Sequence, residues 1–368
     1  MAAATPLFIF DGHTDVPTRL WESPANLREQ QSDRHVDLPR LRRGGVSGLV
    51  FAFFLPAHLS PEGGLAHAEA MHRLSTAQLR PGEIELVTTS EELDAAAARG
   101  AVGVVFGLEN GRPLVLPGAL ERLLAMGVRL VTLTHVGTHE WCDAAGDDEA
   151  HGGLSRDGAG SGENIVRRLN RAGVLIDVSH VSDRAVEHVL EVSTAPVVAS
   201  HSSARALCDH PRNLTDELAR SIVARGGLVM VNAFPVFLDP VAERANRERM
   251  AHLREPMRAL EEAYAGRPAE LHAAKLQLLA PYPQPPVPLS VFVDHVMHLL
   301  GVVGEEGVGI GTDFDGIPET PVGFEDVSRF PHLVAALRER GVDERTLRLV
   351  MGDNFRRVWR RVAANGGG

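Results

Sequence analysis

Eight short apolar runs, rich in Val, Ile, Leu and Phe, recur along the chain with helix-length stretches between them. This alternation is typical of a parallel sheet of βα units, because parallel neighbours are joined by a long crossover that usually contains a helix. Eight such strands favour an α/β fold closed into a (β/α)8, TIM-like barrel over an open sheet. The runs are Leu7–Phe10, Gly48–Phe54, Val102–Leu108, Val128–Thr134, Val174–Val178, Val197–Ser200, Gly227–Ala233 and Val308–Gly311.

Stretches with helical periodicity fill several of the gaps between these runs. Some of them open on Ser, Pro or Gly, residues that often begin helices. The predicted helices are Leu65–Leu79, Ser90–Arg99, Pro117–Ala125, Gly162–Ala172 and Asp183–Glu191.

Two segments exceed what a bare barrel needs. Residues 239–288 combine a charged helical stretch with the Pro-rich bend Pro281–Pro288, which predicts a helical insertion or lid between strands seven and eight. Residues 330–362 predict closing helices after the last strand. Neither segment is large enough for a separate domain, so residues 1–368 are interpreted as one barrel domain of the metal-dependent hydrolase type.

The composition excludes several other classes of protein. Hydrophobic residues make up 44% of the chain and charged residues 23%, as in ordinary globular proteins. The net charge is −11 and the basic residues are scattered among acids, which argues against a nucleic-acid partner. Met1–Phe10 lacks the basic region and length of a signal peptide, and no apolar run reaches the roughly 18 residues of a membrane span. We therefore expect a cytoplasmic protein without membrane attachment.

Side chains that can bind metal follow six of the eight runs directly. The first run leads into His13 and Asp15, which share a face because side chains two apart on a strand point the same way. One such pair is weak evidence, and each histidine alone is better explained as a hydrogen-bonded core side chain. Potential ligands after several strands favour a metal site instead, because the carboxyl ends of all barrel strands lie on one face and bring these side chains together. The other groups are Glu109, His135, His180, His201, and the pair Asp313 and Asp315.

Imidazole and carboxylate ligands suit zinc or a similar divalent ion. The only cysteines, Cys142 and Cys208, are too few for a thiolate cluster and are interpreted as free core thiols. Five ligands are too many for one open zinc site but natural for two ions that share a carboxylate, where a bound water becomes the nucleophile. The expected ligands are His13, Asp15, Glu109, His180 and His201.

The bridging ligand is expected to be Glu109. Binuclear barrel hydrolases often use a modified lysine as the bridge, but the only lysine here, Lys275, lies in the predicted insertion. Glu109 is the remaining candidate from the third strand end. A salt-bridged glutamate without metal is the alternative interpretation.

Three further residues fit roles in hydrolysis. His135 is not needed as a ligand once the five expected ligands are assigned. It is interpreted as a hydrogen-bond donor to the oxyanion that forms on the attacked carbonyl. Asp313 is suited to carry a proton from the attacking water to the leaving amine, and Asp315 competes for this role because the two carboxylates share a face. Arg212, after the sixth strand, is suited to bind a substrate carboxylate through its planar fork of donors.

These residues lie in motifs that resemble the membrane (renal) dipeptidase family of zinc peptidases, peptidase family M19, in a soluble bacterial form. The motifs occur in family order over nearly the whole chain. They are Asp11-Gly12-His13-Thr14-Asp15, Gly107-Leu108-Glu109, Leu133-Thr134-His135, Asp177-Val178-Ser179-His180, Ser200-His201-Ser202-Ser203-Ala204, Arg212-Asn213 and Asp313-Phe314-Asp315-Gly316.

The resemblance implies a zinc-dependent dipeptidase with two Zn2+ per chain, in which a metal-bridging hydroxide attacks the peptide bond. It implies that His13, Asp15 and Glu109 hold one zinc, and that Glu109, His180 and His201 hold the other. It assigns His135 to substrate contact near the scissile bond, Arg212 to the terminal carboxylate and Asp313 to the proton. Similar bacterial proteins accept a D-residue at the C-terminal position. Family members are often dimers, so a homodimer is expected by analogy.

Some features depart from the family or leave other functions open. Asn110-Gly111-Arg112-Pro113 stands where many relatives have glycines and a histidine, and the disulfides and lipid anchor of mammalian members are not expected here. A second hypothesis keeps the metals but hydrolyses another amide, a lactone or an N-acyl amino acid. A third is a catalytically silent relative that binds peptides or metal, against which the complete ligand set argues.

Overall fold

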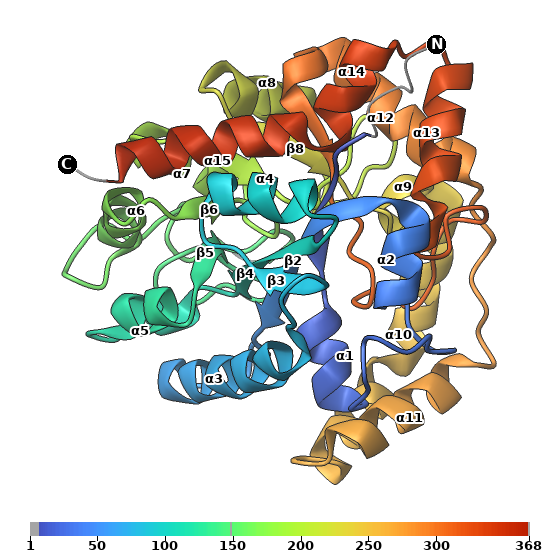
Figure 1. Ribbon diagram of the computed structural model, residues 1–368. Helices are drawn as coiled ribbons and strands as arrows, with labels where there is room; N and C mark the ends of the chain where they lie inside the picture. Colours follow the sequence, from blue (N-terminus) through green and yellow to red (C-terminus); the bar gives the residue numbers. More distant parts are fainter. Residues whose placement is uncertain (1–6, 148, 367–368) are drawn as a thin grey trace.

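Eight parallel strands form the barrel of the protein, in the order β1-β2-β4-β5-β6-β7-β8-β9 (Figure 1). The computed structural model describes residues 7–147 and 149–366. Each of the eight apolar runs overlaps one of these strands, so the predicted (β/α)8 fold is confirmed. The strands are β1 (Ile9–Thr14), β2 (Val46–Phe54), β4 (Val102–Glu109), β5 (Val128–Thr132), β6 (Leu175–Asp177), β7 (Val197–Ala199), β8 (Leu228–Val231) and β9 (Val308–Ile310).

The barrel closes between β1 and the chain that follows β9. The N–H of Asp313 donates to the carbonyl of His13 at 3.0 Å, and the N–H of Asp15 donates to the carbonyl of Phe314 at 2.8 Å. Asp11 adds side-chain bonds, accepting from the N–H of Thr312 at 2.8 Å and from its hydroxyl at 2.6 Å. Closure therefore joins the two segments that carry His13, Asp15 and Asp313.

One short strand was not expected from the sequence. β3 (Ile84–Leu86) pairs in parallel with the first residues of β4, whereas β5 pairs with β4 only from Phe106 onward. β3 thus covers the edge of β4 that β5 leaves free. Three residues with a central Glu85 are too few to show an apolar run or an alternating pattern.

The helices between strands begin at defined hydroxyl caps. A Ser or Thr side chain accepts a hydrogen bond from the backbone N–H three residues later at the start of α3, α4, α6, α7 and α8. α3 starts earlier than predicted because Ser60 caps it and Pro61 occupies its first turn. The first eight helices are α1 (Val16–Glu22), α2 (Leu38–Gly44), α3 (Pro61–Gln78), α4 (Ser90–Ala98), α5 (Ala119–Ala125), α6 (Gly162–Arg171), α7 (Asp183–Val192) and α8 (Asp216–Ala224).

The segment between β8 and β9 contains four helices: α9 (Pro235–Leu238), α10 (Pro240–Ala263), α11 (Pro268–Leu279) and α12 (Leu289–Val303). The charged helical stretch predicted within residues 239–288 is divided into α10 and α11, with Gly266 at φ +74° in the turn between them. The two helices form a hairpin, and α11 packs beside α1 (Figure 1). The helix α12 follows the Pro-rich bend and packs against α8 and α13.

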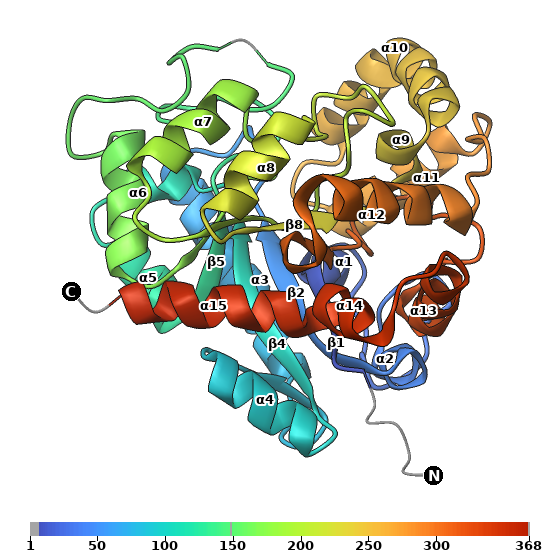
Figure 2. The same cartoon turned by 90° about the horizontal axis from the view of Figure 1, so that it is seen from above.

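The chain ends in α13 (Phe330–Glu339), α14 (Glu344–Arg348), a π-helical turn (Leu349–Asp353) and α15 (Asn354–Asn365). α15 crosses the barrel from α14 to the side of α6 (Figure 2). Phe355 stacks on Phe10 of β1 with ring centroids 3.8 Å apart, and Val358, Trp359 and Val362 join the same buried cluster. Because Phe10 lies near the start of β1, α15 covers the end of the barrel opposite the carboxyl ends of the strands.

The predicted single domain of residues 1–368 includes residues 1–6, 148 and 367–368, which lie outside the described part of the chain. Its single-domain organisation stays a prediction. Within residues 7–147 and 149–366, no helix combines the length and hydropathy needed to cross a membrane.

The packing of α15 predicts that Phe355→Ala lowers the free energy of unfolding by about 3–5 kcal/mol, because Phe355 is 1% exposed and no neighbouring side chain replaces its ring. Denaturant unfolding measures the change. Ala364→Ser on the exposed side of α15 is the control and should cost no more than about 0.5 kcal/mol. A loss below about 1 kcal/mol for Phe355→Ala would contradict this role of α15.

Candidate metal centre

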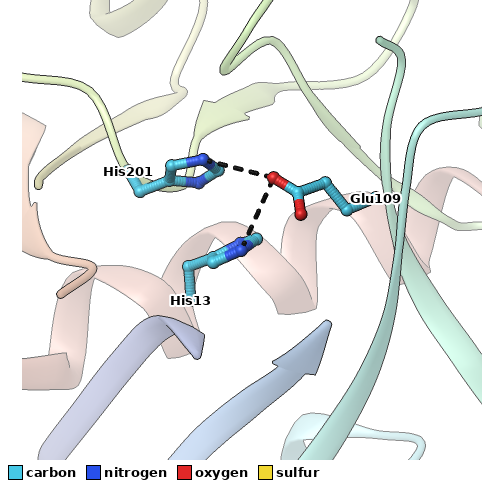
Figure 3. Close-up of side chains that lie close together, drawn as sticks. All are labelled: His13, Glu109 and His201. Atoms are coloured by element: carbon cyan, nitrogen blue, oxygen red, sulfur yellow. Dashed lines mark ion pairs between the residues drawn. The ribbon is translucent and has the colours of Figure 1, made fainter. Parts of the chain in front are cut away.

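Glu109, the last residue of β4, lies at the centre of a buried cluster at the carboxyl end of the barrel. Its Oε1 atom is 3.6 Å from His13 Nε2, 3.1 Å from His180 Nε2 and 3.5 Å from His201 Nε2. Figure 3 shows His13 and His201 directed at this oxygen from separate strand ends. Three imidazoles from β1, β6 and β7 thus converge on one carboxylate that is only 3% exposed.

Two more acidic side chains and a fourth histidine lie in the same cluster. Three groups of potential ligand atoms have all their members within 4.8 Å of one another: His13 with Glu109 and His201, Glu109 with His135 and His180, and His13 with Asp15 and Asp313. Glu109 and His13 each belong to two of these groups, so the three groups form one connected cluster. The structure therefore brings together all five residues predicted as metal ligands, together with His135 and Asp313.

Unusual backbone conformations occur where the chain leaves the strands at this cluster. His180, Asp313 and Asn110 have φ values of 67°, 66° and 84°, in the left-handed region that non-glycine residues seldom adopt. Each such residue costs on the order of 1 kcal/mol and persists because surrounding contacts impose it. Strain of this kind concentrates at functional sites, and two of these residues, His180 and Asp313, belong to the cluster.

A hydrogen-bonded network fixes the orientation of His201. Asp177 at the end of β6 accepts from the Ser200 hydroxyl at 2.7 Å and from the Thr132 hydroxyl at 2.6 Å. Because the Ser200 proton goes to Asp177, the Ser200 oxygen accepts from His201 Nδ1, 2.7 Å away. The lone pair of His201 is then on Nε2, which faces Glu109, as a metal-binding tautomer requires.

The buried nitrogens of the cluster test whether a cation fits. Among the described residues, both ring nitrogens of the fully buried His13 and Nδ1 of His180 have no hydrogen-bond partner. Buried polar atoms without a partner are rare and costly. Imidazole nitrogens and carboxylate oxygens are the ligands that zinc and similar divalent ions prefer. The donor set and its unpaired atoms therefore fit bound divalent cations.

The pKa values of the cluster reflect the same need for positive charge. Burial raises the pKa of Glu109 well above its ordinary value. Burial alone would lower the pKa of His13, but the carboxylates of Glu109, Asp15 and Asp313 outweigh it and raise the pKa to about 10. The cluster thus takes up protons when no other cation is present, and a divalent ion would displace them.

Arg212 is buried beside the cluster and is 8% exposed. Its Nη2 donates to the carbonyl of His201 at 3.3 Å, its Nε has no partner among the described residues, and its guanidinium carbon is 5.4 Å from the centroid of the Phe237 ring. Burial lowers the pKa of Arg212 to about 10, so the side chain remains a cation at neutral pH.

His135 lies on another side of the cluster, between two aromatic rings. Its ring centroid is 4.2 Å from that of His180 and 4.6 Å from that of Phe54. Burial lowers the pKa of His135 to about 3. The imidazole is therefore neutral at pH 7 and can donate one N–H.

Asp313 and Asp315, between which the sequence could not choose as the proton carrier, have different surroundings. Asp313 lies with His13 and Asp15, and its Oδ2 accepts from Asn232 Nδ2 at 3.0 Å. Asp315 is turned away, accepting from the backbone N–H of His35 at 2.7 Å. Both residues have φ near +67°, so the rule that side chains two apart share a face does not apply to them. Asp313 is therefore the aspartate next to the predicted ligands.

Comparison with known proteins identifies the family. The model of the membrane dipeptidase family, peptidase family M19, matches residues 2–366. The chain belongs to this family. A dipeptidase of Schizosaccharomyces pombe, described as uncharacterized, is 30% identical over 96% of the chain and 80% of its own length. Membership supports dipeptidase activity, and the resemblance inferred from the sequence motifs is confirmed.

Two solved structures of similar proteins extend the comparison to three dimensions. The probable dipeptidase PvdM from Pseudomonas aeruginosa has a TM-score of 0.81 at 28% identity, covering 98% of this chain and 96% of its own. A metallo peptidase from Rhodobacter sphaeroides, liganded with a phosphinate mimic of the dipeptide L-Ala-D-Ala, has a TM-score of 0.78 at 25% identity, covering 97% of this chain and all of its own, 100%. The dipeptidase family fold thus spans the described chain.

Sequence reasoning gave no role to two residues of the site of this M19 family member. Asn232 directly follows β8 but lies inside the predicted run Gly227–Ala233, where its polar side chain was the one signal that the strand ends earlier. Gly316 is the second: a Cβ there would lie 2.7 Å from Asp313 Oδ1 and would also collide with Asp15. Only glycine lets the chain pass so close to both carboxylates.

The orientation of His201 predicts that Ser200→Ala weakens metal binding by roughly 10- to 100-fold, because the variant removes the partner of His201 Nδ1. Competition with a chelator of known affinity measures the change. Ser221→Ala, on the exposed face of α8, is the control and should leave the affinity unchanged. Equal affinities in Ser200→Ala and the unmodified protein would show that this network does not support the metal.

Proposed function

We propose that the chain is a zinc-dependent dipeptidase that holds two Zn2+ ions. His13, Asp15 and Glu109 hold one ion, and Glu109, His180 and His201 hold the other. The convergence of three imidazoles on Glu109 Oε1, at 3.1–3.6 Å, is the observation that carries this proposal. When bound, the ions polarise the scissile carbonyl and lower the pKa of the attacking water.

Arg212 binds the C-terminal carboxylate of the substrate in this proposal. It is a buried cation whose Nε has no hydrogen-bond partner among residues 7–147 and 149–366, and such a group gains most from a ligand that brings negative charge. A carboxylate held at a fixed distance from the metal centre limits the substrate to one residue beyond the scissile bond. This limit favours dipeptides over longer peptides.

Asp313 and His135 act on the reacting atoms. Asn232 donates to Oδ2 of Asp313, and this bond leaves Oδ1 to take a proton from the attacking water and deliver it to the leaving nitrogen. The neutral His135 donates its N–H to the carbonyl oxygen as negative charge develops there. Water adds to the carbonyl carbon, the C–N bond breaks, and the products are two amino acids.

Dipeptides with a C-terminal D-residue are included in the proposed substrates. Support comes from the Rhodobacter sphaeroides relative, which was crystallised with a phosphinate mimic of L-Ala-D-Ala. A panel of L,L and L,D dipeptides, incubated with the zinc-loaded protein, tests the proposal through release of free amino acids. Cleavage of at least one class is expected. Absence of cleavage across the panel would contradict dipeptidase activity.

Arg212→Ala should lower kcat/KM for dipeptides by roughly 100- to 1000-fold, because a charge-assisted pair in a buried site contributes about 3–4 kcal/mol. The effect should be far smaller for the matching dipeptide amides, which lack the carboxylate. Arg212→Lys keeps the charge but loses the planar fork. Its kcat/KM for dipeptides should therefore lie between the values of the unmodified protein and of Arg212→Ala. Intact dipeptide turnover by Arg212→Ala would instead favour another amide, a lactone or an N-acyl amino acid as substrate.

A further inference from the structure

A cavity of about 660 Å³ lies beside the metal centre, between the barrel and the hairpin of α10 and α11. One wall consists of Thr18 and Trp21 of α1, and another of Phe54 with the loop that follows β2. The outer wall is the hairpin, through the turn Tyr264–Pro268 and Leu271 of α11. Cavities of roughly 300–1000 Å³ are typical of small-molecule sites.

The inner end of the cavity borders the metal centre through Thr18 and His135. The Thr18 hydroxyl donates to Asp15 Oδ1 at 2.9 Å. Phe54 is the register partner of Glu109 in the pairing of β2 with β4. His135 lines the cavity and also belongs to the ligand cluster with Glu109. The cavity therefore lies close enough to the metal centre to receive a side chain of a substrate bound there.

The walls of the cavity suit an apolar or aromatic group. Trp21 and His67 pack edge to face with centroids 5.0 Å apart, and Met71 forms part of the lining. The charged side chains of the lining are already paired: Glu22 with Arg19 at 3.0 Å, Lys275 with Glu261 at 2.7 Å, and Arg267 with Glu270 at 2.8 Å. Within the described part of the chain, each Asp, Glu, Lys or Arg of the lining thus has a partner of opposite charge, so the walls do not select a charged ligand.

The position of Arg212 indicates which part of a dipeptide reaches the cavity. Arg212 follows β7 and Asp313 follows β9, whereas the inner walls of the cavity come from residues that follow β1, β2 and β5. Arg212 is not part of the lining. With the carboxylate of the substrate on Arg212, the N-terminal residue is the one left to face the cavity.

We infer that this cavity is the subsite for the side chain of the N-terminal residue, and that the α10–α11 hairpin is its outer wall. The chain therefore favours dipeptides with a bulky apolar or aromatic N-terminal residue, since a methyl group would leave most of the cavity unfilled. This inference rests on the proposed dipeptidase function. The hairpin is held in place by α1, where His272 Nδ1 of α11 lies 3.1 Å from Glu22.

The test compares kcat/KM of the zinc-loaded protein for Phe-Ala, Leu-Ala, Ala-Ala and Ala-Phe. Phe-Ala and Leu-Ala should exceed Ala-Ala by roughly tenfold or more, and Ala-Phe should gain no such advantage. Leu271→Asp places a charge in the outer wall and should remove most of that advantage, leaving Ala-Ala within about twofold. Leu276→Asp is the matched control on the same helix, because Leu276 is 49% exposed and does not line the cavity.

Retained hydrolysis of Ala-Ala shows that each variant is folded and metal-loaded. Ala265→Trp, at an exposed position of the hairpin turn, fills the cavity without touching the core and should also lower turnover of Phe-Ala selectively. Equal preference for Ala-Ala and Phe-Ala, or an equal effect of Leu271→Asp on both, would overturn the subsite while leaving the dipeptidase proposal intact. Failure of the unmodified protein to cleave any dipeptide would overturn both.

Discussion

The contact of three imidazoles with one buried carboxylate oxygen is the constraint on which the site depends. A carboxylate as buried as Glu109 is costly unless positive charge or hydrogen bonds compensate it. His13, His180 and His201 come from three different strands, so their meeting at Glu109 requires the barrel to bring β1, β4, β6 and β7 into register. The same arrangement leaves ring nitrogens of His13 and His180 without a hydrogen-bond partner in the described part of the chain, and divalent ions would compensate for this.

Closure of the barrel makes this arrangement possible for residues that lie far apart in the sequence. Asp11 and Thr312 are joined by two hydrogen bonds, and the backbone of Asp313 bonds to that of His13. Loss of these bonds would separate the first ligand strand from the aspartate proposed to carry the proton. At the other end of the barrel, α15 packs its aromatic side chains on Phe10, so packing that stabilises the fold is kept apart from the site.

Much of the site was predictable because it follows from one rule of the fold. Polar residues placed directly after apolar strands must meet at the carboxyl end of a parallel barrel, and this reasoning found the five proposed ligands and His135. Arg212 lies farther along the loop after β7 and was selected for its planar fork of donors. It failed where the backbone departs from strand geometry. Asp313 and Asp315 both have left-handed φ values, so alternation could not tell which one faces the cluster. β3, the break between α10 and α11 and the cavity beside them depend on packing between distant segments, which a pattern in one segment does not reveal.

The most direct test of the central claim is the zinc content of the purified protein and of Glu109→Ala, measured by elemental analysis after zinc supplementation. The account predicts about two zinc ions per chain for the unmodified protein and at most about one for the variant, with loss of dipeptide hydrolysis. Glu109→Gln, which keeps the shape but removes the charge, should also fail to hold both ions. Two tightly bound zinc ions and retained activity in Glu109→Ala would contradict the role of Glu109 as the shared ligand.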